Sequence, residues 1–542
     1  MRRSLLAVLT AALMIFSLRP ESAPARTDPK LDAAPAGIAP TSATVAEVLR
    51  QHAKAIGALE PGTPNTRRET WRLSDAGFAG TETLVRRGLD YHARLSHGPF
   101  VEEYGQVDGK RWHLGLNGTV SSRVAEDYVS FAMFRVLEDA ADPKNDLKML
   151  GEVREAKPAY VIEVRLPLEK HPEWIFFDEA TGLVDRTEGV VDDERIVSTY
   201  DDYRVTKGLS EPWHVHDTEG ASGVEYDYLR QSLAIGDPVE AAEFKVPEGR
   251  FNPATVVGPA AIPSKITNAV VVVRLNVGDR GLDFELSAGQ PESLIDRDVA
   301  AELKLPTFGQ MTHARDGDLG YDTQIADAKI GSISLHDFAL RAESFHYHAD
   351  GGTKIVGVLG SDFLSSGLFL IDYVNRNVQL EAASSADGIA AAANSWDMPV
   401  RFDDGIPFVK GTIAQHDSDS ILFSNAFPFS MIFGAFTSRY PQAIPDTKGK
   451  AHAVASVPFA DSKSYGQAVE LWITRVPDFF FGTLHLKNQP MFATNVDLPA
   501  TRRIDAVVGA DTLQYFDIYL DFAHQRLILL PNKFFFKAYK LS

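Results

Sequence analysis

The 542-residue sequence contains no cysteine. Without thiols the chain can form no disulfide bond, no thiolate nucleophile and no cysteine-ligated zinc site. Basic residues are also in the minority, because 54 Lys and Arg stand against 73 Asp and Glu and leave a formal net charge of −19. An acidic chain is repelled by phosphate backbones, so we expect no nucleic-acid partner.

Apolar runs long enough to cross a bilayer are missing, but one shorter run lies near the N-terminus. Arg2 and Arg3 precede LLAVLTAALMIFSL, and APA at 23–25 offers a cleavage site after Ala25. This order of charge, apolar run and small residues is typical of a secretory signal peptide. We therefore predict a cleaved signal at 1–25, a periplasmic or secreted mature protein, and no membrane span.

A linker and a β-rich domain follow the signal. Residues 26–43 are rich in Ala, Pro and Thr, which indicates a linker. Apolar residues recur with helical spacing over 44–57, so we expect a helix there. Short alternating runs then predict antiparallel strands, interrupted by one helix at 125–139. These patterns predict a curved antiparallel sheet or half-barrel over 44–250, followed by a linker at 251–265.

The remaining chain is a tandem repeat. IGSISLHDFA in the first copy matches FGTLHLKNQP in the second. GVLGSDFL followed by LIDYVNRNVQL matches AVVGADTL followed by YLDFAHQRLIL. Gly360 and Asp372 are 12 residues apart in the first copy, as are Gly509 and Asp521 in the second. Matched alternation, glycines and Asp-aromatic pairs predict two β-rich lobes, at 265–385 and 395–535.

Each copy begins with a hairpin of two strands. VVVVRLNVGDRGLDFELSAG contains the first hairpin, and IPFVKGTIAQHDSDSILFSNAF contains the second. Ser287 and Ser424 fall at equivalent places, each at the end of the second strand of its hairpin. The loop that follows this strand therefore begins with a serine in both copies.

This arrangement resembles that of the retropepsin-like and pepsin-like aspartic peptidases over about residues 265–535. LGSDFL at 359–364 with IDY at 371–373, and VGADTL at 508–513 with LDF, are similar to segments that in this family cross behind an Asp-Thr/Ser-Gly loop. The resemblance implies a mainly β fold with two β-barrel lobes that face each other like the halves of a peptidase dimer. Because both lobes lie in one chain, it implies a monomer.

The catalytic positions of that family hold other residues here. Asp-Thr-Gly would fall on Ser287-Ala288-Gly289 and on Ser424-Asn425-Ala426, and neither DTG nor DSG occurs in the sequence. Two neighbouring carboxylates share one proton in such an active site, whereas a serine hydroxyl takes no proton from water near neutral pH. General acid–base groups contribute about 10²–10⁴-fold each. We therefore interpret Ser287, Gly289 and Ser424 as a pseudo-active site.

The chemistry of these serines and of four aspartates allows other roles. A serine nucleophile needs a base held by a third group, and no histidine has a spacing that indicates this role, so the serines are expected to cap tight turns. Four aspartates could replace the missing acids, but their strand and helix-start positions favour local capping or surface exposure. These are Asp362, Asp372, Asp511 and Asp521.

Two His-x-His pairs would place both imidazoles on one face of a strand. Spacing reveals no third ligand for either pair, so we predict no metal site, and no cofactor is expected. The pairs are His214 with His216 and His346 with His348. NGT at 117–119 matches a glycosylation sequon, which alone means little.

The N-terminal domain resembles periplasmic outer-membrane lipoprotein carriers more weakly, over about residues 44–250. GEVREAKPAYVIEV, WIFFDEATGLVDR and STYDDYRV carry this resemblance. Those carriers are half-barrels that hold acyl chains, so it implies a concave face for an apolar ligand. The aromatic residues that could line it equally suit the core of the sheet. They are Trp112, Tyr160, Trp174, Phe176 and Tyr203.

Together these features predict an exported, catalytically inactive peptidase-like protein that binds a peptide or protein segment in the cleft between its lobes, where sheet edges can pair with an extended chain. One alternative is an active aspartic endopeptidase whose acids lie elsewhere in the sequence. The other is a periplasmic carrier of a lipid or apolar ligand. Opposed carboxylates between the lobes would favour the first alternative, and an enclosed apolar cavity in the N-terminal domain would favour the second.

Overall fold

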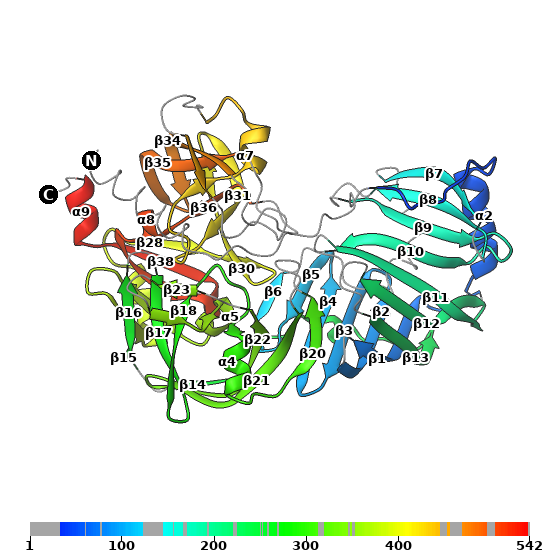
Figure 1. The fold of residues 1–542 in the computed structure, drawn as a ribbon, viewed down its shortest axis with the longest axis horizontal. Helices are drawn as coiled ribbons and strands as arrows, with labels where there is room; N and C mark the ends of the chain where they lie inside the picture. The colour runs from blue at the N-terminus through cyan, green and yellow to red at the C-terminus, as the bar shows by residue number, and fades with distance from the viewer. Residues whose placement is uncertain are drawn as a thin grey trace.

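The computed structural model describes residues 33–59, 61–75, 78–122, 145–154, 157–165, 171–191, 194–219, 225–249, 251, 253–256, 259–267, 270–312, 319–344, 347–349, 353–444, 452–455, 469–495 and 504–539. The predicted signal peptide, the predicted helix at 125–139 and His346 lie outside these residues. Within them the chain is mainly β, as the sequence predicts (Figure 1). No described helix is both long and apolar enough to cross a membrane.

Helix α2 (Val45–Ile56) forms where helical spacing predicts it. The Thr44 hydroxyl accepts a hydrogen bond from the Glu47 amide at 3.2 Å, and the Glu47 carboxylate accepts one from the Thr44 amide at 2.8 Å. This reciprocal capping box satisfies two backbone donors at the start of the helix. The helix ends at Gly57, whose φ of +77° is one that glycine adopts without strain.

One continuous antiparallel sheet follows α2, as the alternating pattern predicts. Neighbours in sequence pair from β1 to β6 and from β7 to β13, and β1 pairs with both β2 and β13. Because α2 packs against both β7 and β12, which are far apart in this order, the sheet curves around the helix. The strands are β1 (Thr66–Asp75), β2 (Phe78–Arg87), β3 (Asp90–His97), β4 (Phe100–Val107), β5 (Lys110–Leu114), β6 (Val120–Ser122), β7 (Asp146–Val153), β8 (Ala159–Arg165), β9 (Glu173–Asp178), β10 (Val184–Val191), β11 (Glu194–Thr206), β12 (Leu209–Glu219) and β13 (Glu225–Ile235).

The two sequence repeats fold with the same order of elements. The first contains β16 (Ser264–Thr267), β17 (Val270–Val277), β18 (Arg280–Leu286), β19 (Leu294–Asp296), α4 (Arg297–Glu302), β20 (Phe308–Thr312), β21 (Leu319–Ile330), β22 (Ile333–Glu343), β25 (Gly357–Leu359) and α5 (Ser361–Leu364). The second contains β29 (Arg401–Asp403), β30 (Ile406–Ile413), β31 (His416–Phe423), β32 (Met431–Ile432), α7 (Gly434–Arg439), β33 (His452–Ala455), β34 (Val469–Phe481), β35 (Leu484–Thr494), β36 (Ala506–Val508) and α8 (Ala510–Leu513). The first repeat adds the hairpin β23 (Tyr347–Ala349) and β24 (Thr353–Ile355), and helices α6 (Ala386–Ala390) and α9 (Lys533–Tyr539) lie after each repeat's strands.

A six-stranded sheet joins the two repeats. Its order is β15-β27-β26-β37-β38-β28, so the repeats meet where β26 pairs antiparallel with β37. The strands are β15 (Ala260–Ile262), β26 (Leu368–Asp372), β27 (Asn377–Glu381), β28 (Trp396–Pro399), β37 (Phe516–Asp521) and β38 (Arg526–Pro531). The residues expected to form a linker at 251–265 instead contribute β15, which pairs with β27, and β14 (Ala254–Val256), which pairs with β22. Both are only three residues long, too short for an alternating pattern to show.

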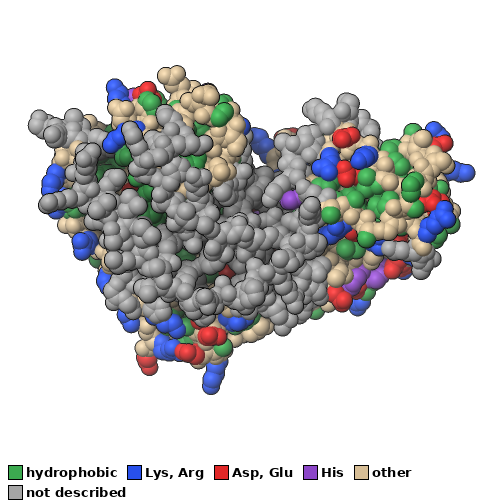
Figure 2. Space-filling view, turned by 45° about the horizontal axis from the view of Figure 1, so that its top comes forward, with side chains coloured by type: hydrophobic (Ala, Val, Ile, Leu, Met, Phe, Trp, Pro, Cys, Tyr) green, Lys and Arg blue, Asp and Glu red, His purple; other side chains and the backbone are tan. Residues whose placement is uncertain are grey.

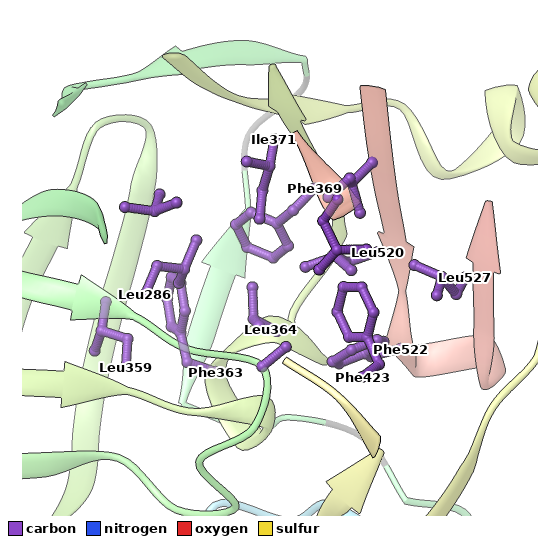
Figure 3. Packing of buried hydrophobic residues seen from close by; sticks show 14 of the residues in the cluster. Leu286, Leu359, Phe363, Leu364, Phe369, Ile371, Phe423, Leu520, Phe522 and Leu527 are labelled. Carbon is purple, nitrogen blue, oxygen red and sulfur yellow. The ribbon is translucent and has the colours of Figure 1, made fainter. Parts of the chain in front are cut away.

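One hydrophobic core runs through both repeats and this joining sheet. Phe369 and Ile371 of β26 pack in the same cluster as Leu520 of β37 and Phe423 of β31 (Figure 3). Leu286 and Leu359, from the first repeat, belong to it as well. The two repeats are therefore expected to unfold together.

Replacing Ile371 with alanine tests that expectation. Ile371 is fully buried and pairs across the junction with Ile518, so the cavity should cost about 2–5 kcal/mol of unfolding free energy. We expect a single urea transition for both repeats, shifted to lower denaturant, whereas Val205→Ala at a site that is 73% exposed should leave it in place. Two separate transitions, of which only one moves, would contradict a shared core.

Candidate functional site

The two serines that sequence comparison aligns lie at equivalent points of the two repeats. Ser287 follows β18, and its amide donates to the carbonyl of Leu359 in β25 at 3.0 Å. Ser424 follows β31, and its amide donates to the carbonyl of Val508 in β36 at 3.2 Å. In each repeat a parallel strand thus continues the ladder up to the serine, which fixes where the loop begins.

The loops that these serines begin approach each other closely. A Cβ atom built on Gly289 would lie only 2.6 Å from the hydroxyl oxygen of Ser424, so a side chain at 289 would collide with the other loop. Gly289 is therefore needed for a close approach of the two repeats. The structure brings together all three predicted pseudo-active-site residues, Ser287, Gly289 and Ser424.

Asn425 bridges the two loops with a single side chain. Its amide nitrogen donates to the carbonyl of Leu286 at 2.7 Å, and its amide oxygen accepts from the backbone amide of Ala288 at 2.8 Å. Asn425 is fully buried. The bridge is one-sided, because Ala288 at the matching position of the first repeat has no polar side-chain atom.

A second serine in each loop is anchored on an aspartate, which is buried in the first repeat and half-buried in the second. Ser293 donates to Asp362 at 2.7 Å and accepts from the Gly360 amide at 3.0 Å. In the second repeat the hydroxyl of Ser430 is 2.7 Å from Asp511, and it accepts from the Gly509 amide at 3.2 Å. Burial raises the pKa of both aspartates to about 6. Both carboxyl groups act as acceptors that hold the loops.

The anchor of the first repeat is completed from the N-terminal sheet. Asn117, between β5 and β6, donates to Asp362 at 2.8 Å and exchanges hydrogen bonds with the backbone of Ala339. The anchor of the second repeat is completed by residues of that repeat, since Gln489 donates to Thr512, whose hydroxyl oxygen is 2.7 Å from that of Ser430. Sequence reasoning missed Asn117, although it begins the NGT triplet. Its buried, fully engaged amide leaves no room for a glycan in the folded protein.

The other two candidate acids lie at strand ends. Asp372 accepts from the backbone amides of Val374 and Asn375, both at 2.9 Å, and so caps a turn. Asp521 is 2.7 Å from Nδ1 of His524. Of the two predicted alternatives, local capping is seen for Asp372, whereas Asp362 and Asp511 bind loop serines instead. Surface exposure does not apply to Asp362, Asp372 or Asp521, which are all buried. None of these contacts involves Ser287 or Ser424.

Glu285 is the acid that sequence reasoning missed. It lies two residues before Ser287 on β18, so both side chains leave the same face of the strand, while Phe284 and Leu286 point into the core. Burial raises the pKa of Glu285 to about 8. The matching residue of the second repeat is Leu422. The aligned strings FELS and ILFS could have revealed it, because Glu285 aligns with an apolar residue of the second repeat.

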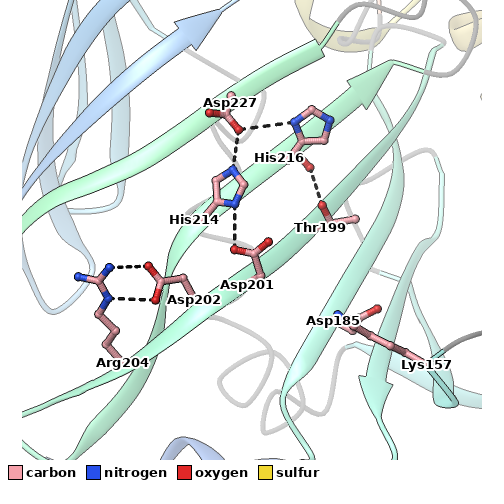
Figure 4. A network of polar contacts seen from close by, with 9 residues as sticks. All are labelled: Lys157, Asp185, Thr199, Asp201, Asp202, Arg204, His214, His216 and Asp227. Carbon is pink, nitrogen blue, oxygen red and sulfur yellow. Dashed lines mark hydrogen bonds and ion pairs between the residues drawn. The ribbon is translucent and has the colours of Figure 1, made fainter.

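The histidine pair on β12 is held by carboxylates. His214 Nδ1 lies 2.8 Å from Asp201 and its Nε2 lies 2.5 Å from Asp227, while His216 Nδ1 is 3.7 Å from Asp227 (Figure 4). These contacts raise the pKa of His214 against the opposing effect of its partial burial. Among the residues that the structure describes, no group of three or more His, Asp or Glu side chains is arranged to hold a metal ion.

The five aromatic candidates of the N-terminal sheet do not share one surface. Tyr160 and Tyr203 pack in the cluster beneath α2, whereas Trp174 and Phe176 belong to a separate buried cluster. Trp112 lies against His92, with ring centroids 5.3 Å apart. These side chains are parts of the core rather than the lining of one cavity.

The face of the sheet that α2 covers becomes ionic along β1. Arg67, Glu69 and Trp71 alternate with outward residues there, so all three point to the side of α2. Arg230 lies 3.1 Å from Glu69 and 3.0 Å from Glu211, and its guanidinium stacks over Trp71. Arg230 and Glu69 have fully buried side chains. Ion pairs at this depth are costly to desolvate and poorly suited to an acyl chain.

No protein-family model and no curated protein matches the sequence. Solved structures that resemble it include an aspartic proteinase from Irpex lacteus, with 11% identity, a TM-score of 0.31, and coverage of 51% of this chain and 98% of that chain. Basic 7S globulin from soybean has 12% identity, a TM-score of 0.32, and coverage of 52% and 97%. A LolA superfamily protein from Nitrosomonas europaea has 10% identity, a TM-score of 0.29, and coverage of 38% and 99%. Values this low transfer no function to this chain.

Substituting Asn425 tests the bridge between the loops. Asn425→Ala leaves the Leu286 carbonyl and the Ala288 amide without their side-chain partner, and each buried unpaired group costs about 1–3 kcal/mol. We expect a clear drop in the free energy of unfolding, measured with urea. Asn276→Ala, at an exposed position of β17, is the matched control. Equal stability of the two variants would show that the bridge contributes nothing.

The buried carboxyl of Glu285 should shape the dependence of stability on pH. Its pKa rises from 4.5 to about 8 on folding, so the folded state holds this proton more tightly than the unfolded state. The contribution of this proton to the free energy of unfolding is fully present below about pH 4.5, and it is lost as the pH rises to about 8.

Glu285→Gln stays neutral at every pH, so it should flatten this slope and be more stable than the wild type above pH 8. Urea unfolding at pH 5, 6.5, 8 and 9 measures the effect, with exposed Glu302→Gln as the control. A slope unchanged in Glu285→Gln would place the charge of Glu285 in a solvated environment.

Proposed function

We propose that this chain is a non-catalytic, peptidase-like protein that binds a peptide or protein segment between its two repeats. The observation that carries this proposal is the chemistry of the opposed loops. Where they approach each other, the loops contribute Ser287 and Ser424 and the amide of Asn425, which already binds the Leu286 carbonyl and the Ala288 amide. These groups can donate and accept hydrogen bonds, but none takes a proton from water near neutral pH.

The architecture supports a binding role. The two β-rich repeats share their order of elements, closely approaching loops and aspartate anchors, and the residues that the structure describes place no pair of acids between these loops. Extended peptides bind such surfaces by adding backbone hydrogen bonds to strand edges. Because β26 and β37 join the repeats within one chain, we propose that a monomer is sufficient to build the site.

An active aspartic endopeptidase would need two carboxyl groups that share a proton. Asp362 and Asp511 are each occupied in their own repeat by a loop serine, and Glu285 is matched by Leu422 in the other repeat. The described residues thus place an acid next to the serine on one side only. This asymmetry disfavours the two-acid mechanism.

A carrier of a lipid or apolar ligand is disfavoured by the N-terminal sheet. On the face that α2 covers, the helix itself packs over one part and the buried pairs of Arg230 occupy another. We propose that this sheet instead supports the first repeat, since Asn117 completes the anchor of Asp362.

The N-terminal sequence further supports export to the periplasm or the exterior. On the face seen in Figure 2, acidic and basic side chains lie near one another along the lower edge and on the right-hand part, with apolar and uncharged surface elsewhere.

A peptide library tests binding and hydrolysis together. We expect wild-type protein to retain a subset of extended peptides and to leave all of them intact, as judged by mass spectrometry after prolonged incubation between pH 4 and pH 8. Ser287→Ala combined with Ser424→Ala should give the same absence of cleavage. Cleavage by the wild type that disappears in this double variant would overturn the proposal, and so would retention of no peptide at all.

A further inference from the structure

The two repeats differ on the face of the sheet that carries the loop serines. In the second repeat, paired residues on neighbouring strands form a row across β30, β31, β36, β32 and β35. Every side chain in this row is apolar, and all but the last are buried in one cluster. The row consists of Phe408, Leu422, Val507, Met431 and Phe492.

The same row in the first repeat contains charge. It crosses β17, β18, β25, β19 and β22 through equivalent pairings, and it consists of Val272, Glu285, Val358, Leu294 and Arg341. The strand partner of Arg341 is Asp322, where the second repeat has Ile473 opposite Phe492. In the second repeat the neighbours of the serine in the sheet are therefore buried apolar side chains, whereas in the first repeat they include an acid.

The charges at the far end of the row are already matched. Arg341 lies 3.5 Å from Glu292 and 3.9 Å from Asp322. Glu285 has apolar neighbours on both sides in the sheet, Val272 and Val358. Within the described part of the chain, no Lys, Arg or His is paired with the Glu285 carboxyl group, and desolvation is the cause of its raised pKa. A buried acid in this position is stabilised by a cation that arrives with a ligand.

We propose that Glu285 binds the primary amine or guanidinium group of a basic side chain, while the row that contains Leu422 and Met431 holds a large apolar side chain of the same peptide. The preferred ligand is then an extended segment that carries Lys or Arg close to an aliphatic or aromatic residue. This inference rests on the proposed function, and it adds both the class of peptide and its direction across the two repeats.

Ligand entry should affect the association rate, and the protonation of Glu285 should affect how the affinity depends on pH. Glu285 and Ser287 are only 9% and 7% exposed, and Leu422 and Met431 only 7% and 2%. Entry of either ligand side chain therefore requires local opening, and association should be slower than the usual 10⁵–10⁷ M⁻¹s⁻¹. Because Glu285 is protonated near neutral pH in the free protein, a cation that binds it must displace a proton. Affinity should therefore increase as the pH rises from 6 to 8.

The test starts from peptides that the wild-type protein selects from the random library. Each selected peptide is resynthesised with its basic residue as lysine and as acetyl-lysine, and both forms are titrated by calorimetry at pH 6 and pH 8. We expect the lysine form to bind about 10- to 100-fold more tightly at pH 8, the gain typical of a charge-assisted contact. At pH 7, titrations in buffers of different ionisation enthalpy should show release of close to one proton.

Glu285→Gln is the decisive variant, because it keeps the size of the side chain. It should bind the lysine and acetyl-lysine forms equally and release no proton, while exposed Glu302→Gln should behave like the wild type. Selection of peptides without basic residues, or discrimination retained in Glu285→Gln, would overturn the assignment of Glu285 and leave peptide binding itself intact. If wild-type protein selects no peptide, the proposed function is wrong and the assignment fails with it.

Discussion

The side chain of Asn425 is the contact on which the arrangement of the site depends. It reaches from one repeat into the other and satisfies a backbone donor and a backbone acceptor that would otherwise be buried without partners. Behind it, the β26–β37 junction and the common core hold the repeats in one unit. With both constraints in place, the loops cannot separate without exposing polar backbone and apolar core together. Close approach of Gly289 and Ser424 is a consequence of this geometry.

The two repeats share the contacts that anchor their loops, but they differ in the side chains next to the loop serines. Ser293 with Asp362 and Ser430 with Asp511 reproduce the same anchor, down to the glycine amide that each serine accepts. In contrast, the position that holds Glu285 in the first repeat holds Leu422 in the second. A mechanism with two equivalent acids needs symmetry at this point, whereas recognition of an asymmetric ligand benefits from its loss. On this ground we propose that the site binds a ligand and does not hydrolyse it.

Much of this architecture was predictable from the sequence, because strands and helices produce periodic spacings of apolar residues. Alternation predicted the sheets, helical spacing of apolar residues over 44–57 predicted α2, and the aligned repeats placed Ser287 and Ser424 at equivalent points. The short strands β14 and β15 could not be predicted, because three residues carry no period. The bridge of Asn425 and the insertion of Asn117 also escaped prediction, since each contact joins residues more than one hundred positions apart. Glu285 could have been found by asking where the repeats differ in charge.

The central claim is that the space between the loops stabilises no transition state. It is tested most directly by comparing the affinity of a selected peptide with that of an analogue in which one backbone amide is replaced by a hydroxyl-bearing tetrahedral carbon. Active peptidases bind such transition-state analogues at least about 10²-fold more tightly than the parent substrate. The account predicts affinities that agree within a few-fold wherever the replacement is placed. An analogue bound about a hundredfold more tightly than its peptide would contradict it.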